Sequence, residues 1–305
     1  MLFHRLAPKT NFNKLSAQGM KLQTKPLLTI TAVILTAAII LSRCISFEVD
    51  PITVIDSNGK PAIEQTVQLD QTALHYLESG NSAGTVLVFI HGTPGSMGFF
   101  SGYITDPRLT QTRNITIDRP GWGKSIVNGP FDPTLTFQSS ALGNWLCDIK
   151  QASPNNKLVV VAHSYGATLT PKLAMDHPQC ISAALLLAGG ADPKLTAPRW
   201  YNNLAHYPPV SWLVSLFSMD LKRSNNEMMS VKTELEKIQL DWQKLKLPIT
   251  VIQGEEDGLV HPDNADFIET QLAHIPAKII RVEGAGHVLR ESHRDLIMDE
   301  ILNLL

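Results

Sequence analysis

Cysteine is scarce: the chain has three cysteines in 305 residues, and no two of them form a CxxC pair. This excludes a disulfide-built scaffold and argues against a zinc ribbon or a thioredoxin-type site. Cys147 and Cys180 could pair in an oxidising compartment or remain buried thiols. Six histidines have no second or third ligand at metal-binding spacing, so we expect no metal and no cofactor: His75, His177, His206, His261, His274 and His293.

Acidic residues are absent from the first 45 positions, which carry six basic ones: Arg5, Lys9, Lys14, Lys21, Lys25 and Arg43. The other 260 residues hold 20 basic and 28 acidic side chains, a net charge of −8. An acidic body argues against nucleic-acid binding, which depends on a basic patch. A hydrophobic content of 44% with 18% charged residues excludes an intrinsically disordered chain.

Residues 26–42 form a run of 17 uncharged, mostly apolar residues between Lys25 and Arg43. As a helix it would be about 26 Å long, close to the thickness of a bilayer core. Basic residues precede the run and acidic ones follow it, so the amino terminus is expected in the cytoplasm and the body outside it. We therefore predict a basic region at 1–25, a transmembrane or signal-anchor helix at 26–45, and a single-pass membrane protein facing the bacterial periplasm.

Three alternatives for this segment remain open. A cleaved signal peptide would release a secreted protein. Residues 41–44 resemble a lipobox, which would lipidate Cys44, although Arg43 stands where a small residue belongs. Met20 is a possible alternative start, because a shorter and more ordinary signal sequence begins there.

The body alternates short apolar runs with helical patterns. Two extended pieces across Asp70-Gln71 predict an antiparallel hairpin at a sheet edge. Runs that are apolar throughout are typical of parallel strands buried on both faces. They occur at 85–90, 115–117, 158–162, 183–188, 249–252 and 278–282. Helices are expected at 137–150, 165–176, 263–273 and 288–305. This alternation predicts an α/β fold with a parallel sheet between helices.

Residues 190–246 interrupt this alternation, since they contain no clear strand. They hold three of the five tryptophans, Trp200, Trp212 and Trp242, together with several Tyr and Met residues. We interpret this region as a helical cap insertion, with some aromatic side chains packed on the body and others lining a pocket.

The strongest chemical signal is the sequence AHSYGA at 162–167, directly after a predicted strand and before a predicted helix. Ser164 at such a junction fits a nucleophile elbow, a strained turn that exposes the hydroxyl at the end of a strand. Ala162 and Gly166 supply the small neighbours that this turn needs. HGTPG at 91–95 follows another strand, where backbone N–H groups can bind an oxyanion. Because Pro94 has no N–H, we predict the amides of Thr93 and Tyr165 as the two donors.

A carboxylate and an imidazole follow the last two strands. Asp257 lies in GEEDGLVHP (254–262) and His287 ends GAGH (284–287). The ends of neighbouring parallel strands share one edge, so these groups can meet there. A serine needs a histidine base, and the histidine needs an orienting carboxylate. We predict Ser164, Asp257 and His287 as the catalytic residues, with Asp192 as the alternative acid.

These motifs, together with DRPGWGKS at 118–125, resemble the α/β-hydrolase family in order and spacing over about residues 62–305. The resemblance implies a mostly parallel eight-stranded sheet flanked by helices, with a hydrolase domain at 46–305 that includes the cap. The first small residue of the elbow departs from the usual glycine and is Ala162 here. Ser164 differs from the aspartate that epoxide hydrolases and haloalkane dehalogenases of this fold use.

The predicted function is a serine hydrolase that cleaves an acyl bond, with an ester of a small, apolar acyl substrate favoured by the aromatic and Met-rich cap. HGTPG is also similar to the HGGPG of proline iminopeptidases, which keeps an aminopeptidase open as an alternative, besides a thioesterase. A ligand-binding protein without enzymatic activity is the alternative from another class.

Overall fold

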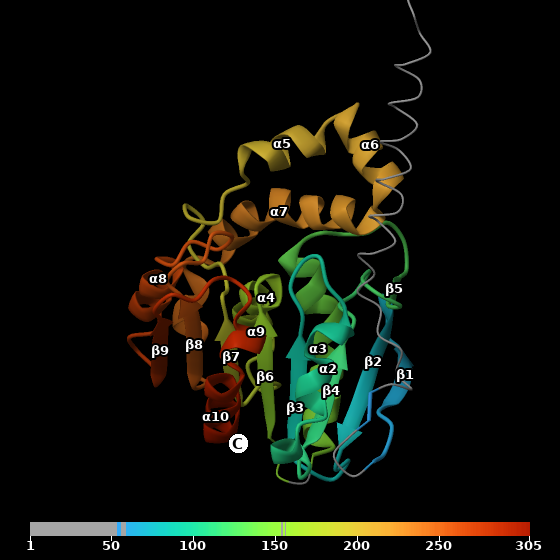
Figure 1. Ribbon diagram of the computed structural model, residues 1–305, viewed down its shortest axis with the longest axis vertical. Coiled ribbons are helices and arrows are strands. Elements are labelled where there is room, and N and C mark those ends of the chain that lie inside the picture. Colours follow the sequence, from blue (N-terminus) through green and yellow to red (C-terminus); the bar gives the residue numbers. More distant parts are fainter. Residues whose placement is uncertain (1–53, 56–58, 154, 156) are drawn as a thin grey trace, which may run out of the picture. The chain divides into compact units, whose positions relative to one another are not determined.

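A mostly parallel β-sheet runs through the part of the chain that this computed structural model describes, residues 54–305 without 56–58, 154 and 156 (Figure 1). Its strands are β1 (Ile63–Gln68), β2 (Thr72–Gly80), β3 (Val86–Ile90), β4 (Arg113–Ile117), β5 (Ile126–Val127), β6 (Leu158–His163), β7 (Ala183–Leu187), β8 (Ile249–Gly254) and β9 (Ala277–Val282). The strand order is β1-β2-β4-β3-β6-β7-β8-β9. The six neighbouring strands β4, β3, β6, β7, β8 and β9 are parallel to one another. Strand β2 pairs antiparallel with both β1 and β4.

The predicted hairpin is confirmed: β1 pairs with β2 from Ile63↔Glu78 to Gln68↔Ala73, and the turn is closed by a hydrogen bond from the Leu69 N–H to the Thr72 carbonyl at 2.8 Å. The predicted number of eight strands was wrong, because the described residues form a sheet of nine strands. The additional strand is β5, which pairs with β2 beside the eight-strand path. Its two residues are too few to show a period-2 pattern in the sequence.

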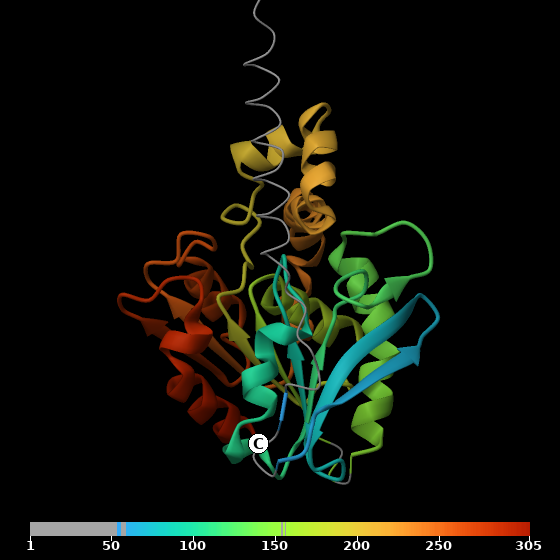
Figure 2. The ribbon, with the colours of Figure 1, turned by 45° about the vertical axis from the view of Figure 1, so that its right-hand side comes forward.

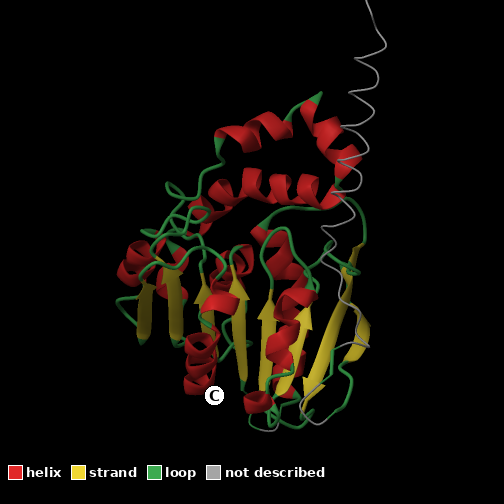
Figure 3. Ribbon diagram, in the orientation of Figure 1, coloured by secondary structure: helices red, strands yellow, loops and turns green. Residues whose placement is uncertain are grey.

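Helices cover both faces of the sheet (Figure 3). Val88 and Ile90 of β3 lie in a core with α3 (Leu135–Gln151), α4 (Tyr165–Asp176) and α8 (Asn264–Gln271). Leu87 and Phe89 lie in a second core with η2 (Met97–Phe100), α2 (Ser101–Ile104), α9 (Leu289–Ser292) and α10 (Arg294–Leu304). The short helix η3 (Pro107–Leu109) precedes β4. Alternate residues of one strand thus pack in the cores on opposite faces of the sheet, which explains why the sequence shows continuous apolar runs.

The helices between β7 and β8 lie beyond one end of the sheet (Figures 1 and 2). They are α5 (Trp200–His206), α6 (Val210–Phe217), α7 (Met219–Ile238) and η4 (Asp241–Lys244). Residues 190–246, for which the sequence predicts a cap, contain all four. We call α5, α6 and α7 the cap.

Cys147 of α3 and Cys180, just before β7, form a disulfide with Cα atoms 4.3 Å apart. The structure thereby selects the paired alternative for these two thiols. The predicted basic region at 1–25, the anchor at 26–45 and the lipidation site at Cys44 lie outside the described residues. Within the described part of the chain, no helix combines the length and the apolar character needed to cross a bilayer.

Candidate active site

Ser164 stands at the sharp turn between β6 and α4. Its φ of 54° and ψ of −121° are unusual for a residue with a side chain. A hydrogen bond from the Ser164 N–H to the Leu187 carbonyl, 2.9 Å long, ties this turn to neighbouring β7. The turn therefore has the strained geometry that the sequence predicts for a nucleophile elbow.

Two glycines allow other backbone segments to approach this turn. A Cβ atom on Gly166 would come within 2.5 Å of the Ile90 carbonyl oxygen, and one on Gly92 within 2.7 Å of the Ser164 Cβ. Both contacts are shorter than any side chain tolerates, so only glycine fits at either position. The loop after β3 therefore lies directly against Ser164.

The two predicted oxyanion donors lie beside Ser164. Thr93 and Tyr165 line the same cavity as the serine. Tyr165 is the first residue of α4, so its N–H has no acceptor within the helix. The Thr93 hydroxyl is buried there without a hydrogen-bond partner. The sequence predicted only the amide of Thr93 as a donor, and this orphaned hydroxyl is a further polar group that a ligand could satisfy.

Asp257 and His287 are brought together at the ends of β8 and β9. The His287 Nδ1 lies 2.8 Å from Asp257 Oδ2, and both side chains are largely buried. Asp257 Oδ1 accepts hydrogen bonds from the Leu259 and Val260 amides at 2.8 and 2.9 Å. Because a carboxylate faces Nδ1, that nitrogen carries the proton, which leaves Nε2 free to act as a base. Gly254 permits the approach of the two loops, since a Cβ there would lie 2.3 Å from the Ala285 carbonyl oxygen.

The carboxyl of Asp257 is held ionised. Burial disfavours its charge, but the hydrogen bond and charge of His287 and the two amide hydrogen bonds outweigh this and lower the pKa of Asp257. Asp192, the alternative acid, instead accepts a hydrogen bond from the Lys194 amide at 2.8 Å. The geometry therefore joins His287 to Asp257 and leaves Asp192 in another loop.

A cavity of about 280 Å³ lies between the carboxyl edge of the sheet and the cap. Ser164, Thr93, Tyr165 and His287 line it from the sheet, and Tyr201, Asn202, Met228 and Val231 line it from the cap. Arg199 also lines it, and no aspartate or glutamate does among the residues that the structure describes. Nor do these residues contain a group of three or more His, Cys, Asp or Glu side chains able to hold a metal ion.

Two further histidines support the site without facing the cavity. His91 accepts a hydrogen bond from the Arg119 amide at Nε2 and lies 2.7 Å from the Gly92 carbonyl oxygen at Nδ1. His163 lies 2.9 Å from the His287 carbonyl oxygen and stacks on Phe99. Burial lowers the pKa of each histidine to about 3, and the neighbouring Arg119 adds to this effect at His91 and His287 at His163. Both rings are therefore neutral and serve as hydrogen-bonding supports.

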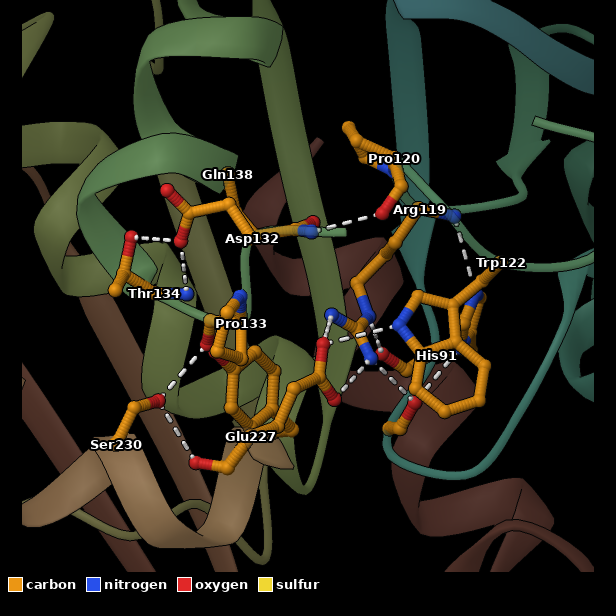
Figure 4. A network of polar contacts seen from close by, with 12 residues as sticks. His91, Arg119, Pro120, Trp122, Asp132, Pro133, Thr134, Gln138, Glu227 and Ser230 are labelled. Carbon is orange, nitrogen blue, oxygen red and sulfur yellow. Dashed lines mark hydrogen bonds and ion pairs between the residues drawn. The ribbon is translucent and has the colours of Figure 1, made fainter. Parts of the chain in front are cut away.

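A fully buried ion pair joins the cap to the sheet edge (Figure 4). The Arg119 guanidinium donates to both carboxylate oxygens of Glu227 in α7 at 2.8 and 3.0 Å, and to the carbonyls of His91 and Gly92. It also lies 4.5 Å from the Tyr165 ring centre. Arg119 was part of the DRPGWG motif but received no role from the sequence, and Glu227 gave no signal there because it is one polar residue in a polar helix.

We expect Glu227→Ala to reduce the free energy of unfolding by about 3–5 kcal/mol, because it leaves the Arg119 charge buried without a counter-charge. Urea denaturation measures this change. The matched control is Glu236→Ala on the same helix, which removes only an exposed pair with Lys232 at 3.8 Å and should cost about 0.5 kcal/mol or less. Equal losses of unfolding free energy in the two variants would show that the buried pair stabilises the protein no more than the exposed pair.

The comparisons with known proteins identify the family and the fold. Residues 87–300, more than two-thirds of the chain, match the model of the alpha/beta hydrolase family. A proline iminopeptidase from Heyndrickxia coagulans is 28% identical over 121 residues, 39% of this chain and 39% of its own length. The chain thus spans about two-fifths of that relative.

Two solved structures share the fold at low identity. An epoxide hydrolase from Vigna radiata has a TM-score of 0.62 at 17% identity, with 79% of this chain and 97% of that chain covered. A bacterial membrane phospholipase A has a TM-score of 0.57 at 17% identity, with 92% and 97% covered. With the family model matched over most of its length, the chain belongs to the alpha/beta hydrolase family.

Proposed function

We propose that this α/β-hydrolase is a serine hydrolase that cleaves a carboxylic ester through an acyl-enzyme intermediate. The observation that carries the proposal is the combination of Ser164 on a strained elbow with His287, which lines the same cavity and is paired with Asp257 behind it. This is the arrangement that a neutral hydroxyl needs to become a nucleophile.

The proposed mechanism assigns one task to each group. His287 Nε2 takes the Ser164 proton as the hydroxyl attacks the acyl carbonyl, and Asp257 stabilises the imidazolium that forms. The amides of Thr93 and Tyr165 donate to the oxyanion, each contributing about 3 kcal/mol to transition-state stabilisation. His287 then returns the proton to the leaving alcohol, and in the second step it activates the water that releases the acid.

The cavity lining favours an ester over a peptide with a free amino terminus. An aminopeptidase must compensate the charge of the substrate's ammonium group, and no carboxylate lines the cavity among the described residues. The buried cap carboxylate of Glu227 is already paired with Arg119. Leu195, Met228 and Val231 instead offer apolar contacts for an acyl group. The partial match to a proline iminopeptidase keeps aminopeptidase activity as the second candidate.

Active-site labelling combined with turnover tests this proposal. We expect the full-length protein to react with a fluorophosphonate, with the adduct mapped by mass spectrometry to the peptide that contains Ser164. It should also hydrolyse a short-chain aryl ester faster than a proline aryl amide. Preference for the amide would move the assignment to an aminopeptidase. Absence of both labelling and turnover in folded protein would favour a ligand-binding member of the fold.

A further inference from the structure

Residues 200–216 of the cap include a group of large apolar side chains exposed to solvent. We call it the apolar face and define it by Trp200, Leu204, Tyr207, Trp212, Leu213 and Leu216. Trp200 is 76% exposed, and Trp212 and Leu216 are each 67% exposed. Figure 1 shows α5 and α6 on the far side of α7 from the sheet. A concentration of this kind marks an interaction surface, whereas single exposed apolar residues are common.

The apolar face is continuous over α6. Trp212, Leu213 and Leu216 line one shallow hollow together with Pro209 and Val210. Helix α6 has the sequence VSWLVSLF and carries no charged residue, and α5, with the sequence WYNNLAH, contains no Asp, Glu, Lys or Arg. Such a surface has no charged groups whose hydration would favour its contact with water.

We propose that the apolar face docks on the surface of a lipid bilayer. Trp and Tyr side chains concentrate at membrane–water interfaces, because their rings are apolar and their N–H and O–H groups remain hydrated. Leucines on the same surface supply the apolar contact with acyl chains. The apolar face combines two Trp and one Tyr with three Leu, which is the composition of an interfacial contact.

The segment of the chain that contains the apolar face also has a charge that suits a membrane surface. Residues 190–223 contain four basic side chains, Lys194, Arg199, Lys222 and Arg223, against the two acidic ones Asp192 and Asp220. This segment therefore has a net charge of +2, although residues 46–305 have a net charge of −8. Anionic lipid headgroups attract such a local excess of basic residues.

The apolar face adjoins the catalytic cavity. Tyr201 of α5 lines the cavity and is 43% exposed on the same helix as Trp200 and Leu204. Leu259, also a cavity residue, is exposed as well. Docking would thus bring the cavity close to acyl chains in the bilayer. This last step rests on the proposed ester hydrolysis, whereas the docking itself does not.

The tryptophans provide a direct test. Of the five in the chain, Trp122, Trp145 and Trp242 are buried, and only Trp200 and Trp212 are exposed. Full-length protein would be reconstituted in vesicles of phosphatidylcholine and phosphatidylglycerol, with and without brominated acyl chains, which quench nearby tryptophans. We expect quenching in the wild type and its loss in Trp200→Phe/Trp212→Phe. Residues 1–53 contain no tryptophan, so the predicted anchor does not contribute to this signal.

A charge-introducing variant tests the contact itself. In Trp212→Glu/Leu216→Glu we expect the quenching of Trp200 to disappear, whereas Ile63→Glu/Ile126→Glu, at equally exposed positions of β1 and β5, should quench like the wild type. Absence of quenching in the wild type, or equal quenching in all variants, would overturn the proposal. If the wild type shows no quenching and Trp212→Glu/Leu216→Glu dissociates a dimer in sedimentation, the face joins two copies of this chain instead.

A hydrolysis assay links docking to catalysis. The Trp212→Glu/Leu216→Glu variant should hydrolyse a long-chain ester embedded in vesicles at least about tenfold more slowly than the wild type, since burial of each large apolar side chain favours association by about that factor or more. Its rate on a soluble short-chain ester should be unchanged. Equal rates on the embedded ester would contradict substrate uptake from the bilayer. Quenching without hydrolysis of either ester would leave docking in place and overturn the proposed function.

Discussion

Replacing Ser164 with alanine should reduce kcat for a short-chain aryl ester by a factor on the order of 10⁶ and abolish fluorophosphonate labelling. The variant removes the oxygen that would form the acyl-enzyme, whereas the amides of Thr93 and Tyr165 stay in place to bind the substrate. The protein should still fold with the stability of the wild type. Ala188, with a φ of 51°, shows that an alanine in this protein is accommodated at a positive φ close to that of Ser164.

Ser224 provides the matched control, since it lines the same cavity from the cap. Ser224→Ala should change kcat by less than about threefold, as expected for a side chain that makes no contact with the reacting atoms. Thermal unfolding of the wild type and the two variants would verify that the substitutions change the rate without changing the stability. Ester turnover that survives Ser164→Ala would place the active site elsewhere.

Asp257→Asn should lower kcat by a factor on the order of 10⁴ with little effect on folding. The asparagine can keep its carbonyl oxygen on the Leu259 and Val260 amides. Its NH₂ group then faces His287 Nδ1, which must become the acceptor, and the proton moves to Nε2. An imidazole in that tautomer cannot take the proton of Ser164, and no negative charge remains to stabilise the imidazolium.

Asp192→Asn tests the alternative acid under the same conditions. Asp192 accepts a hydrogen bond from the Lys194 amide, which an asparagine can also accept, so kcat should stay close to that of the wild type. Steady-state kinetics on the same aryl ester compare the two variants. A larger loss in Asp192→Asn than in Asp257→Asn would transfer the acid to the loop after β7.

Most of the fold could be predicted because the buried strands are short and apolar throughout. Helix α4 begins and ends where the periodicity placed it, at Tyr165 and Asp176. The carboxy-terminal helix was expected to be continuous over 288–305, but the structure divides it at His293 into α9 and α10. Both pieces bury residues on the same core, so their apolar periodicity looks unbroken in the sequence.

The site could be predicted in part, because each motif residue follows a strand and the ends of parallel strands meet at one edge. The sequence could bring Asp257 and His287 together by this argument alone. It could not find the Arg119–Glu227 pair, whose members are 108 positions apart on different layers. Contacts between the cap and the sheet depend on how the cap helices fold back, which no local pattern encodes.

The disulfide between Cys147 and Cys180 has a consequence for the denatured chain. Because it joins positions 33 residues apart, it reduces the number of conformations open to the unfolded protein, which in the chain-entropy account favours the native state by about 4 kcal/mol. That contribution exists only where thiols are oxidised, as outside the bacterial cytoplasm. The same polypeptide made in a reducing compartment would lack it, so its folding equilibrium would depend on the redox state of its surroundings.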